Sequence, residues 1–344
     1  MRAYFDHNAT APIRPQARDA MIAAMDVLGN PSSVHHEGRA AKALLENARA
    51  ELSEAVGASG NDLVFTSGAT EAVAMALKGY GCICAPVEHP SVMAYCDASL
   101  DVVDGKIMGE GDDIARQAAN SETGVLQKGA APVWFEDAVQ AFGKIPYAFS
   151  WRNAKVGAIS AHKFGGPKGI GALMLDASLD LEPLTMGGGQ EGARRAGTEN
   201  ILGAVGMAAA SKAALNDIEN GVWEEIAKLR DKLEDMLLND CPDLEIAGKD
   251  MDRLPNTTNF MVAGWKGETQ VMQMDLAGFA VSAGSACSSG KVRMSSVLRA
   301  MGYDEITAAS GIRVSLGPQN TKQEIESFAV AWLKQYNKWR EKAA

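Results

Sequence analysis

The stretch KVGAISAHKFGGPKG, residues 155–169, joins an apolar strand pattern to a lysine and a glycine-rich loop. Lys163 stands where the strand pattern ends, beside glycines that leave space for a ligand. A partly buried lysine has a lowered pKa and can form a Schiff base with an aldehyde. A surface lysine before a turn is the alternative, and for this stretch alone it is the preferred interpretation.

Strand and helix patterns alternate on both sides of this stretch. Short apolar runs punctuated by Gly or Pro predict buried strands, and apolar residues at three- and four-residue spacing predict helices. Strands are expected at 62–66, 81–87, 132–136, 155–160, 170–175, 257–262 and 312–316, and helices at 14–28, 39–56, 199–215, 222–239, 268–277, 292–301 and 321–342. This alternation predicts an α/β fold with a mainly parallel sheet.

The length of 344 residues suggests two domains, and the change to longer helices predicts a boundary near residue 215.

The formal net charge of −10 argues against nucleic-acid binding. No apolar run approaches the ~20 residues of a membrane span. The five cysteines make no disulfide framework, and no signal peptide is recognisable, so a cytoplasmic location is expected. No metal-binding motif is present, and no metal site is expected.

An acidic residue follows a second strand pattern. Asp137 comes directly after the run 132–136, and Gln140 stands one helical turn later. In an open α/β sheet, ligands bind at the carboxyl ends of the strands. An aspartate there suits a protonated pyridine nitrogen, such as that of pyridoxal phosphate. It equally suits the N-cap of a helix.

Two further segments lie between strand and helix patterns. The run TSGATE at 66–71 suits a phosphate bound at a helix N-terminus, although the same residues can form a capping box. His89 follows the expected strand 81–87, where an imidazole can stack on an aromatic ring or move protons. A structural histidine is the alternative.

Cys287 stands in the run GSACSSG at 284–290, a polar loop that is untypical of a core cysteine. Its accessible thiol is a candidate nucleophile, whereas Cys82, Cys84 and Cys96 are predicted to pack among apolar residues.

Arg313 stands in the strand pattern 312–316 and needs a carboxylate partner, from the protein or from a substrate.

Together and in this order, these motifs resemble the class V aminotransferase family of pyridoxal-phosphate enzymes, and within it the cysteine desulfurases of the NifS/IscS type. The matching segments are FDHNAT (5–10), GNPSS (29–33), SGATE (67–71), EH (88–89), Asp137 with Gln140, 160–169, 187–200, the Cys287 loop and 312–317. The loop GSACSSG indicates a desulfurase rather than an aminotransferase.

The resemblance implies the fold of type I pyridoxal-phosphate enzymes. A large cofactor-binding domain would comprise residues 12–215, with a mainly parallel sheet flanked by helices. A smaller α+β domain would comprise residues 1–11 and 216–344 and carry the cysteine loop. The resemblance also implies a homodimer.

The resemblance further implies a role for each matching position. Lys163 would bind pyridoxal 5'-phosphate covalently, and His89 would stack on its ring. The other cofactor contacts would come from Ala69, Thr70, Ser160, His162 and the second subunit's Thr198 at the phosphate, from Asp137 at the ring nitrogen, and from Gln140 and Ser121 at the phenolate oxygen. Ser121 stands where the family usually has asparagine, and Asn120 is the alternative. Arg313, Asn8 and Asn30 would lie at the substrate.

The implied reaction converts L-cysteine to L-alanine. Cys287 would take the sulfur as a persulfide and pass it to an acceptor protein, such as a scaffold for iron–sulfur clusters, or to thio-cofactor synthesis. A selenocysteine lyase and another class V enzyme are the alternatives, and a non-enzymatic homologue is a third. The exposed Cys287 argues against an aminotransferase, and the presence of Lys163, Asp137 and His89 argues against a homologue without activity.

Overall fold

The computed structural model describes residues 2–58, 63–109, 111–127, 132–284 and 294–343. Within these residues the central sheet has the order β2-β8-β7-β6-β5. Its strands are β2 (Leu63–Thr66), β5 (Ala115–Gln117), β6 (Val133–Asp137), β7 (Ala154–Ser160) and β8 (Gly171–Leu175). The strands β5, β6 and β7 are parallel, whereas β8 is antiparallel to both β7 and β2.

The predicted α/β class is confirmed, and the sheet is mixed because of one short connection. Only residues 161–170 join β7 to β8, including the 3-10 turn η3 (Ala161–Lys163). A parallel neighbour needs a crossover of about a dozen residues or more. The chain therefore turns back into β8, and Lys163 lies in the turn.

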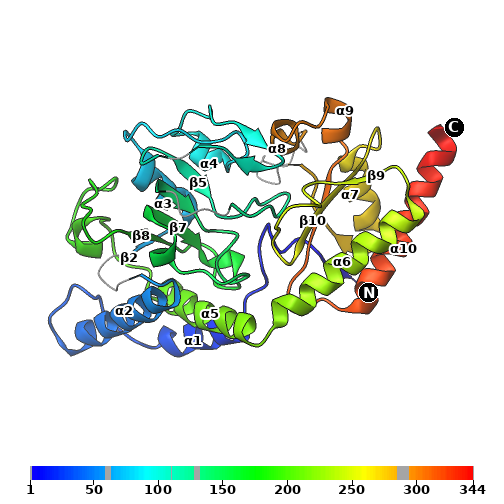
Figure 1. Cartoon of the computed structure of the whole chain (residues 1–344). Coiled ribbons are helices and arrows are strands. Elements are labelled where there is room, and N and C mark those ends of the chain that lie inside the picture. The colour runs from blue at the N-terminus through cyan, green and yellow to red at the C-terminus, as the bar shows by residue number, and fades with distance from the viewer. Residues whose placement is uncertain (1, 59–62, 110, 128–131, 285–293, 344) are drawn as a thin grey trace.

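Helices cover both faces of the sheet (Figure 1). On one face lie α1 (Pro15–Met25), α2 (His36–Ala55) and α5 (Ile201–Glu219). On the other lie α3 (Ala69–Leu77) and the short α4 (Pro90–Met93). Pro15 opens α1 at the first helical position, where its missing N–H costs no hydrogen bond.

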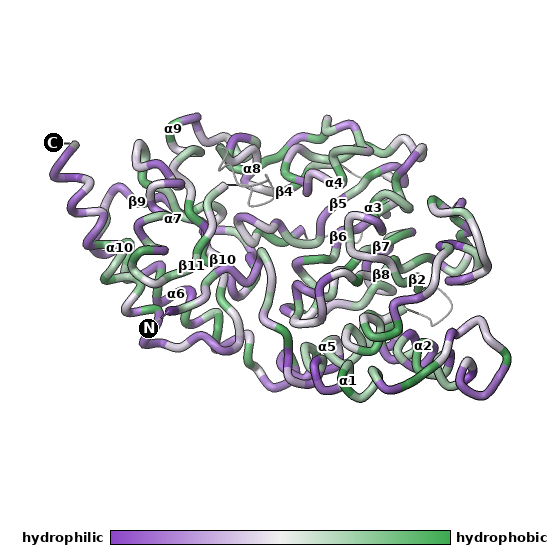
Figure 2. The backbone as a smooth tube through the Cα atoms, turned by 180° about the vertical axis from the view of Figure 1, so that it is seen from behind, coloured by the Kyte–Doolittle hydropathy of each residue, from purple (hydrophilic) through white to green (hydrophobic). Residues whose placement is uncertain are grey.

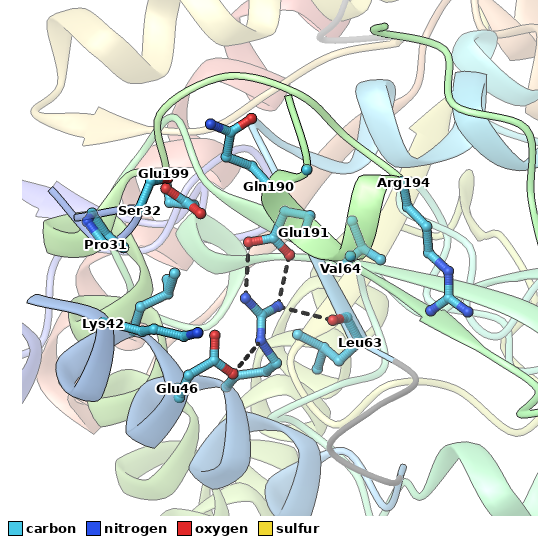
Figure 3. Close-up of a pocket in the computed structure, with 14 residues that line it drawn as sticks. Pro31, Ser32, Lys42, Glu46, Leu63, Val64, Gln190, Glu191, Arg194 and Glu199 are labelled. Atoms are coloured by element: carbon cyan, nitrogen blue, oxygen red, sulfur yellow. Dashed lines mark hydrogen bonds and ion pairs between the residues drawn. The ribbon is translucent and has the colours of Figure 1, made fainter. Parts of the chain in front are cut away.

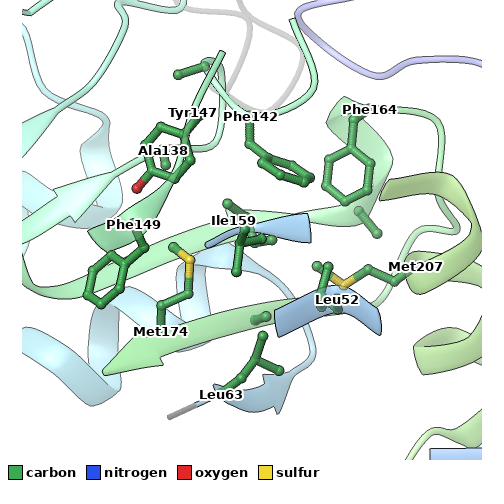
Figure 4. Packing of buried hydrophobic residues seen from close by; sticks show 14 of the residues in the cluster. Leu52, Leu63, Ala138, Phe142, Tyr147, Phe149, Ile159, Phe164, Met174 and Met207 are labelled. Atoms are coloured by element: carbon green, nitrogen blue, oxygen red, sulfur yellow. The ribbon is translucent and has the colours of Figure 1, made fainter. Parts of the chain in front are cut away.

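The core between α2, α5 and the sheet is closely packed (Figure 4). Ile159 and Met174, from β7 and β8, are fully buried. The rings of Phe142 and Phe164 meet edge to face with centroids 4.9 Å apart, a favourable aromatic geometry. Because Phe164 directly follows Lys163, this packing fixes the turn that carries the lysine.

A second core lies beyond the end of α5. Three antiparallel strands have the order β12-β10-β9 in the part of the chain that the structure describes: β9 (Leu244–Ile246), β10 (Thr257–Val262) and β12 (Ile312–Ser315). The helices α6 (Val222–Asp240), α7 (Gly267–Leu276) and α10 (Lys322–Ala343) pack against them. Figure 2 shows hydrophilic and hydrophobic residues alternating along α10, as in a helix with one apolar face.

The N-terminal segment joins this second core. Strand β1 (Ala3–Tyr4) pairs in parallel with β11 (Phe279–Ala280), and Phe5 is fully buried there. The remaining short elements are β3 (Val102–Val103), β4 (Lys106–Ile107), η2 (Phe149–Trp151), η4 (Gln190–Ala193), α8 (Ser296–Ala300) and α9 (Glu305–Ala308). No helix within the described ranges is long and apolar enough to cross a bilayer.

One predicted strand is wrong in extent. Of the segment 81–87, only Ile83 forms bridges, to Asp97 and to Ile114. Pro86, which has no N–H to donate to a ladder, begins a turn. The segment therefore passes the sheet edge and turns toward His89.

Candidate active site

A candidate site for an anion lies where β2, β7 and β8 are side by side. Thr66 pairs with Gly171, and Gly171 pairs with Ser160, so these residues form one row across the sheet. Helix α3 begins after Gly68 without a side-chain cap, so its first N–H groups are available to an anion. A methyl group built on Gly68 would lie 4.0 Å from Ser160 Oγ. The N-terminus of α3, with Ala69 and Thr70, therefore lies close to the Ser160 hydroxyl.

Glycine at position 171 permits this arrangement. A Cβ there would lie 2.8 Å from the Cα of Gly68 and 2.7 Å from the carbonyl oxygen of Ile159. Both are backbone atoms that cannot rotate away. Gly171 thus lets the turn before α3 lie directly on the sheet.

Lys163 lies half-buried at the end of β7. Its Nζ donates hydrogen bonds to the carbonyl oxygens of Asn8, at 2.7 Å, and Ala9, at 2.9 Å. The neighbouring His162 lies 3.2 Å from Thr10 Oγ1 through Nδ1. Burial, with the nearby charges of Lys163 and Lys168, lowers the pKa of His162 to about 4. The imidazole is therefore neutral at physiological pH and can donate one N–H.

Asp137 ends β6, and its Oδ1 accepts a hydrogen bond from the Val139 N–H at 2.9 Å. Burial raises the pKa of Asp137, while His89 and Lys163 act in the opposite direction. His89 caps α4, and its Nδ1 accepts from the Ser91 N–H at 3.2 Å. The structure thus brings Asp137, His89 and Lys163 within electrostatic reach of one another, although they belong to three different segments.

Asn8 lies at the centre of a buried hydrogen-bond network. Its Nδ2 donates to Thr257 Oγ1 at 2.8 Å and to the Ser121 carbonyl at 3.1 Å. Its Oδ1 accepts from Lys144 Nζ at 3.0 Å and from Asn256 Nδ2 at 3.1 Å. The amide is therefore bonded to protein at both ends, and this does not favour the predicted contact of Asn8 with a substrate.

Lys144 is a site residue that the sequence analysis did not identify. Its Nζ also donates to Gln140 Oε1 at 2.6 Å, and Gln140 Nε2 donates to the Asn8 carbonyl at 3.0 Å. Burial, together with the positive charges of Lys163 and Arg313, lowers the pKa of Lys144 well below its usual range. The only signal in the sequence is a lysine four residues after Gln140.

Arg313 lies on β12 and is buried. Its Nη2 forms an ion pair with Asp6 Oδ1 at 2.6 Å, and its Nη1 donates to the Ser121 carbonyl at 3.1 Å. The protein therefore supplies the carboxylate partner that the sequence analysis required. Arg313 Nε is buried without a hydrogen-bond partner among the described residues.

The neighbouring residues Asn120 and Ser121 differ in how their side chains are bonded. The Asn120 Oδ1 accepts from the N–H groups of Glu122 and Thr123, each at 2.9 Å, and Asn120 Nδ2 donates to the Val87 carbonyl. The Asn120 side chain is thus occupied within its own turn. Ser121, by contrast, is half-buried, and its side chain has no such set of bonds among those described.

Cys287 lies outside the described residues, but both flanks of its segment are bonded near Arg313. On one side, Ser282 exchanges two backbone hydrogen bonds with Arg313, at 2.7 and 3.2 Å. On the other, the Ser295 hydroxyl donates to the buried carboxylate of Glu122 at 2.5 Å. Ser282 and Ser295, which stand on either side of the residues outside the described ranges, are thus bonded to Arg313 and to Glu122.

Asn30 and Thr198 lie elsewhere, on the surface. Both line a cavity of about 440 Å³ that also includes Leu28, whereas Lys163 and Lys144 line a different one. Asn30 Oδ1 accepts from the Ser32 N–H at 2.9 Å within its own turn. In a single chain, neither residue is therefore brought to Lys163.

A larger cavity of about 550 Å³ adjoins them, between α2 and η4 (Figure 3). Glu191 projects into it and forms two bonds with the guanidinium of Arg49, at 2.6 and 2.9 Å. Glu191 and Ala193 both have left-handed backbone, with φ of 50° and 65°. Glu191, Gly192 and Ala193 thus form a tight turn of left-handed backbone, in which the Glu191 side chain is buried.

Three comparisons bear on this geometry. The model of the aminotransferase class-V family matches residues 3–94 and 121–328. A cysteine desulfurase of Cereibacter sphaeroides is 36% identical over 365 residues, covering 94% of this chain and 93% of that protein. The chain belongs to this family. The cysteine desulfurase IscS of Dictyoglomus turgidum is 34% identical, over 94% of this chain and 91% of that protein.

Solved structures agree with the assignment to the cysteine desulfurases. The crystal structure of a NifS-like protein from Rickettsia africae superposes with a TM-score of 0.89 at 31% identity, covering 98% of this chain and all of that one. The family and the type I fold predicted from the sequence are confirmed. Pyridoxal phosphate is the cofactor of this family.

The residues of this chain fit that cofactor. A phosphate suits the uncapped N-terminus of α3 beside the Ser160 hydroxyl. A protonated ring nitrogen suits the buried Asp137 carboxylate, whose charge is otherwise costly. Lys163 supplies the amine that an aldehyde requires. Among the described residues no group of three or more His, Cys, Asp or Glu is arranged to hold a metal ion.

Proposed function

We propose that this chain is a cysteine desulfurase that converts L-cysteine to L-alanine and stores the sulfur as a persulfide on Cys287. The observation that carries this proposal is the attachment of both flanks of the Cys287 segment, to Arg313 and to Glu122. An aminotransferase has no use for a thiol in a loop between these two flanks. No observation favours the selenocysteine lyase or another class V activity.

The surroundings of each side chain support the role that we propose for it in the reaction. Bound pyridoxal phosphate supplies an electron sink for the α-carbon of the substrate. Lys163 would bind it and then move a proton at the α-carbon. Its Nζ is held in place by hydrogen bonds to the carbonyl oxygens of Asn8 and Ala9. Asp137 would keep the ring nitrogen protonated, and His89 would cover the ring. The Arg313 guanidinium, oriented by Asp6, would bind the substrate carboxylate.

The cofactor contacts extend beyond these residues. Ala69, Thr70, Ser160 and His162 would bind the phosphate at the N-terminus of α3, and Gln140 with Ser121 would bind the phenolate oxygen. Lys144 Nζ occupies Gln140 Oε1, so the donor that Gln140 would offer to the phenolate oxygen is Nε2, which here donates to the Asn8 carbonyl. The Cys287 thiolate would take the sulfur atom of L-cysteine, so that alanine and a persulfide are the products.

The proposed domains are a large one at 12–215 and a smaller one formed by 1–11 and 216–344. The two buried clusters support this division, since α5 contributes residues up to Leu215 to one cluster and Ile218 to the other. The turn at Gly221, with a left-handed φ of 70°, separates α5 from α6. The smaller domain would carry the cysteine loop against the larger one.

A homodimer completes the proposal. Thr198 and Asn30 line a surface cavity and would reach the site of the second copy, with Thr198 at the phosphate. Large apolar side chains stand exposed along the same segments: Leu28 is 79% exposed, Val34 88% and Met186 85%. Exposed apolar patches of this kind mark interaction surfaces. Analytical ultracentrifugation of the wild type and of Val34→Asp tests the pairing.

The sulfur acceptor is proposed to be a protein that builds iron–sulfur clusters or supplies thio-cofactor synthesis. The cytoplasm is the proposed location, since the four cysteines within the described ranges are free thiols. Fractionation of cells that express the tagged chain tests the location.

Sulfide release from L-cysteine with a thiol reductant tests the function. The cofactor-loaded wild type should release sulfide and form alanine in equal amounts. Cys287→Ala should release none while keeping the cofactor absorbance. A wild type that binds the cofactor but releases no sulfide would contradict the proposal, and selenocysteine and amino-group acceptors would then be tested.

A further inference from the structure

Three cysteines outside the proposed site lie on one face of a two-strand bridge. Ile83 pairs in parallel with Asp97, and the Asp97 N–H and carbonyl bond to Cys82 and Cys84, at 3.1 and 2.8 Å. Side chains alternate along extended backbone, so the neighbours of the paired residues share the opposite face. These neighbours include Cys82, Cys84 and Cys96.

The buried clusters support this alternation. Ile83 packs against the cluster formed with α2 and α5. Cys82 and Cys84 belong instead to the cluster on the α3 side of the sheet, and Cys96 packs against that same cluster. All three thiols are therefore on the same side, away from Ile83.

Cys82 and Cys96 are within disulfide reach. The pairing of Ile83 with Asp97 places Cys82 opposite Cys96 in the register. Neighbouring strands lie about 4.8 Å apart, inside the roughly 4.4–6.8 Å of Cα separation that a disulfide requires. Cys84, two residues after Cys82 and on the same face, competes with Cys82 as the disulfide partner of Cys96.

The chemistry of the three thiols differs. Cys82 and Cys84 are fully buried, whereas Cys96 is half-buried. Hydrogen bonds from the Cys82 and Cys84 thiols lower the pKa of Cys96 to about 4. Thiolate character and access to solvent are the two properties that make a cysteine sensitive to oxidation.

We propose that Cys82, Cys84 and Cys96 form an oxidisable thiol site, in which a hydroperoxide joins Cys96 to Cys82 as a disulfide. The Cys96 sulfur attacks one oxygen of hydrogen peroxide and breaks the O–O bond. Cys96 becomes a sulfenic acid, and the other oxygen leaves as water. The Cys82 sulfur then attacks the Cys96 sulfur, the S–S bond forms, and the sulfenic oxygen leaves as a second water. Two thiols thus lose two electrons and two protons, and the peroxide takes up both.

The disulfide would close a loop with His89 midway between its two ends. His89 begins α4 and lies within electrostatic reach of Asp137. Joining Cys82 to Cys96 would therefore restrain the segment that places the imidazole. This consequence, unlike the thiol site itself, rests on the proposed function, because it assumes that His89 covers the cofactor ring.

Peptide mapping of the oxidised holoprotein tests the thiol site. In a Cys287→Ser background, which removes the loop thiol, hydrogen peroxide treatment and alkylation should yield a cross-linked Cys82–Cys96 peptide that dithiothreitol releases. Cys96→Ser should abolish the cross-link, and Cys241→Ser, at the buried end of α6, should leave it unchanged. Recovery of all three cysteines in alkylated form, or of Cys96 as sulfinic acid with Cys82 free, would overturn the proposal.

The cofactor absorbance and its circular dichroism test the coupling to His89. Both should change when the disulfide forms and recover with dithiothreitol, and neither should change in the Cys96→Ser background. A complete cross-link with an unchanged cofactor signal would overturn the coupling and leave the thiol site standing. Absence of sulfide release by the reduced wild type would instead reject the proposed function, whatever the cross-link shows.

Discussion

Lys144 and Lys163 bind the same residue from two sides. Lys163 Nζ donates to the backbone carbonyl of Asn8 at 2.7 Å, and Lys144 Nζ donates to Asn8 Oδ1 at 3.0 Å. Two ammonium groups near each other repel, and this repulsion is one cause of the lowered pKa of Lys144. The buried lysine therefore acts on the site both through hydrogen bonds and through its charge.

Lys144→Met should lower kcat/KM for L-cysteine by roughly tenfold to a hundredfold. The change removes a donor from both Gln140 and Asn8, and a buried acceptor left without its donor costs about 1–3 kcal/mol. With one positive charge gone, the pH-dependent change in the cofactor absorbance should also move to higher pH. Steady-state kinetics and a spectrophotometric titration measure the two effects.

Lys155→Met is the matched control for Lys144. Lys155 lies at the surface on β7 and pairs with Asp176 at 3.4 Å. The Lys155→Met variant should keep the wild-type kcat/KM and the wild-type pH titration of the cofactor absorbance. A Lys144→Met enzyme with an unshifted titration would show that the charge of Lys144 does not reach the cofactor.

Stability should fall as the pH decreases from 6.5 to 4, in part through His7. Burial, and secondarily the charge of Lys144, lowers the pKa of His7 from 6.5 to about 4. Between these values the unfolded chain binds a proton that the folded chain does not, so the free energy of unfolding rises with pH. For one histidine the change is at most about 3 kcal/mol.

Urea unfolding at several pH values measures this effect. His7→Asn should reduce the dependence between pH 4 and 6.5, and His162, whose pKa is also about 4, should account for part of what remains. His36→Asn, at the exposed start of α2, is the control. An equal slope in wild type and His7→Asn would mean that His7 is protonated in the folded chain.

Ser295→Ala should slow persulfide formation on Cys287 while leaving the cofactor absorbance unchanged. The change removes the hydrogen bond from Ser295 to the buried Glu122 carboxylate, which fixes one flank of the cysteine segment. Loss of a donor to a buried acceptor costs about 1–3 kcal/mol. Single-turnover labelling of the persulfide measures the rate, and Ser296→Ala, at the exposed next position, is the control.

Glu191→Gln should destabilise the fold by about 3–5 kcal/mol, because it leaves the Arg49 guanidinium without its buried partner. The side chain of Glu191 is 2% exposed and that of Arg49 is 11% exposed. Glu191 Oε2 also accepts from the Phe65 N–H of β2 at 2.8 Å. The free energy of unfolding in urea gives the magnitude.

Glu46→Gln is the control for Glu191. Glu46 pairs with the same Arg49 at 3.1 Å but is 49% exposed. An exposed pair contributes at most about 1 kcal/mol. Equal losses for the two variants would mean that burial does not decide the strength of the Arg49 pairs.

Local patterns were enough to predict much of the fold. The helix at 321–342 is nearly that observed, because Thr321 and Glu324 form a reciprocal capping box. Lys163 was located at the end of β7 because the strand pattern stops at the glycine-rich loop. The reversed direction of β8 was not predicted, since it depends on how few residues join β7 to β8.

For the candidate site too, part was determined by the sequence and part by the tertiary structure. The amino-acid sequence alone determined which residue types are present and in what order. This was sufficient to predict the family and the cofactor, and to propose Lys163, Asp137 and His89 as site residues. The tertiary structure decided that Asn8 joins Lys144, Gln140, Lys163 and Thr257. It also decided that Lys144 is buried rather than a surface lysine. Hydrogen bonds between residues far apart in the chain leave no local periodicity, and a side chain's burial depends on every element packed around it.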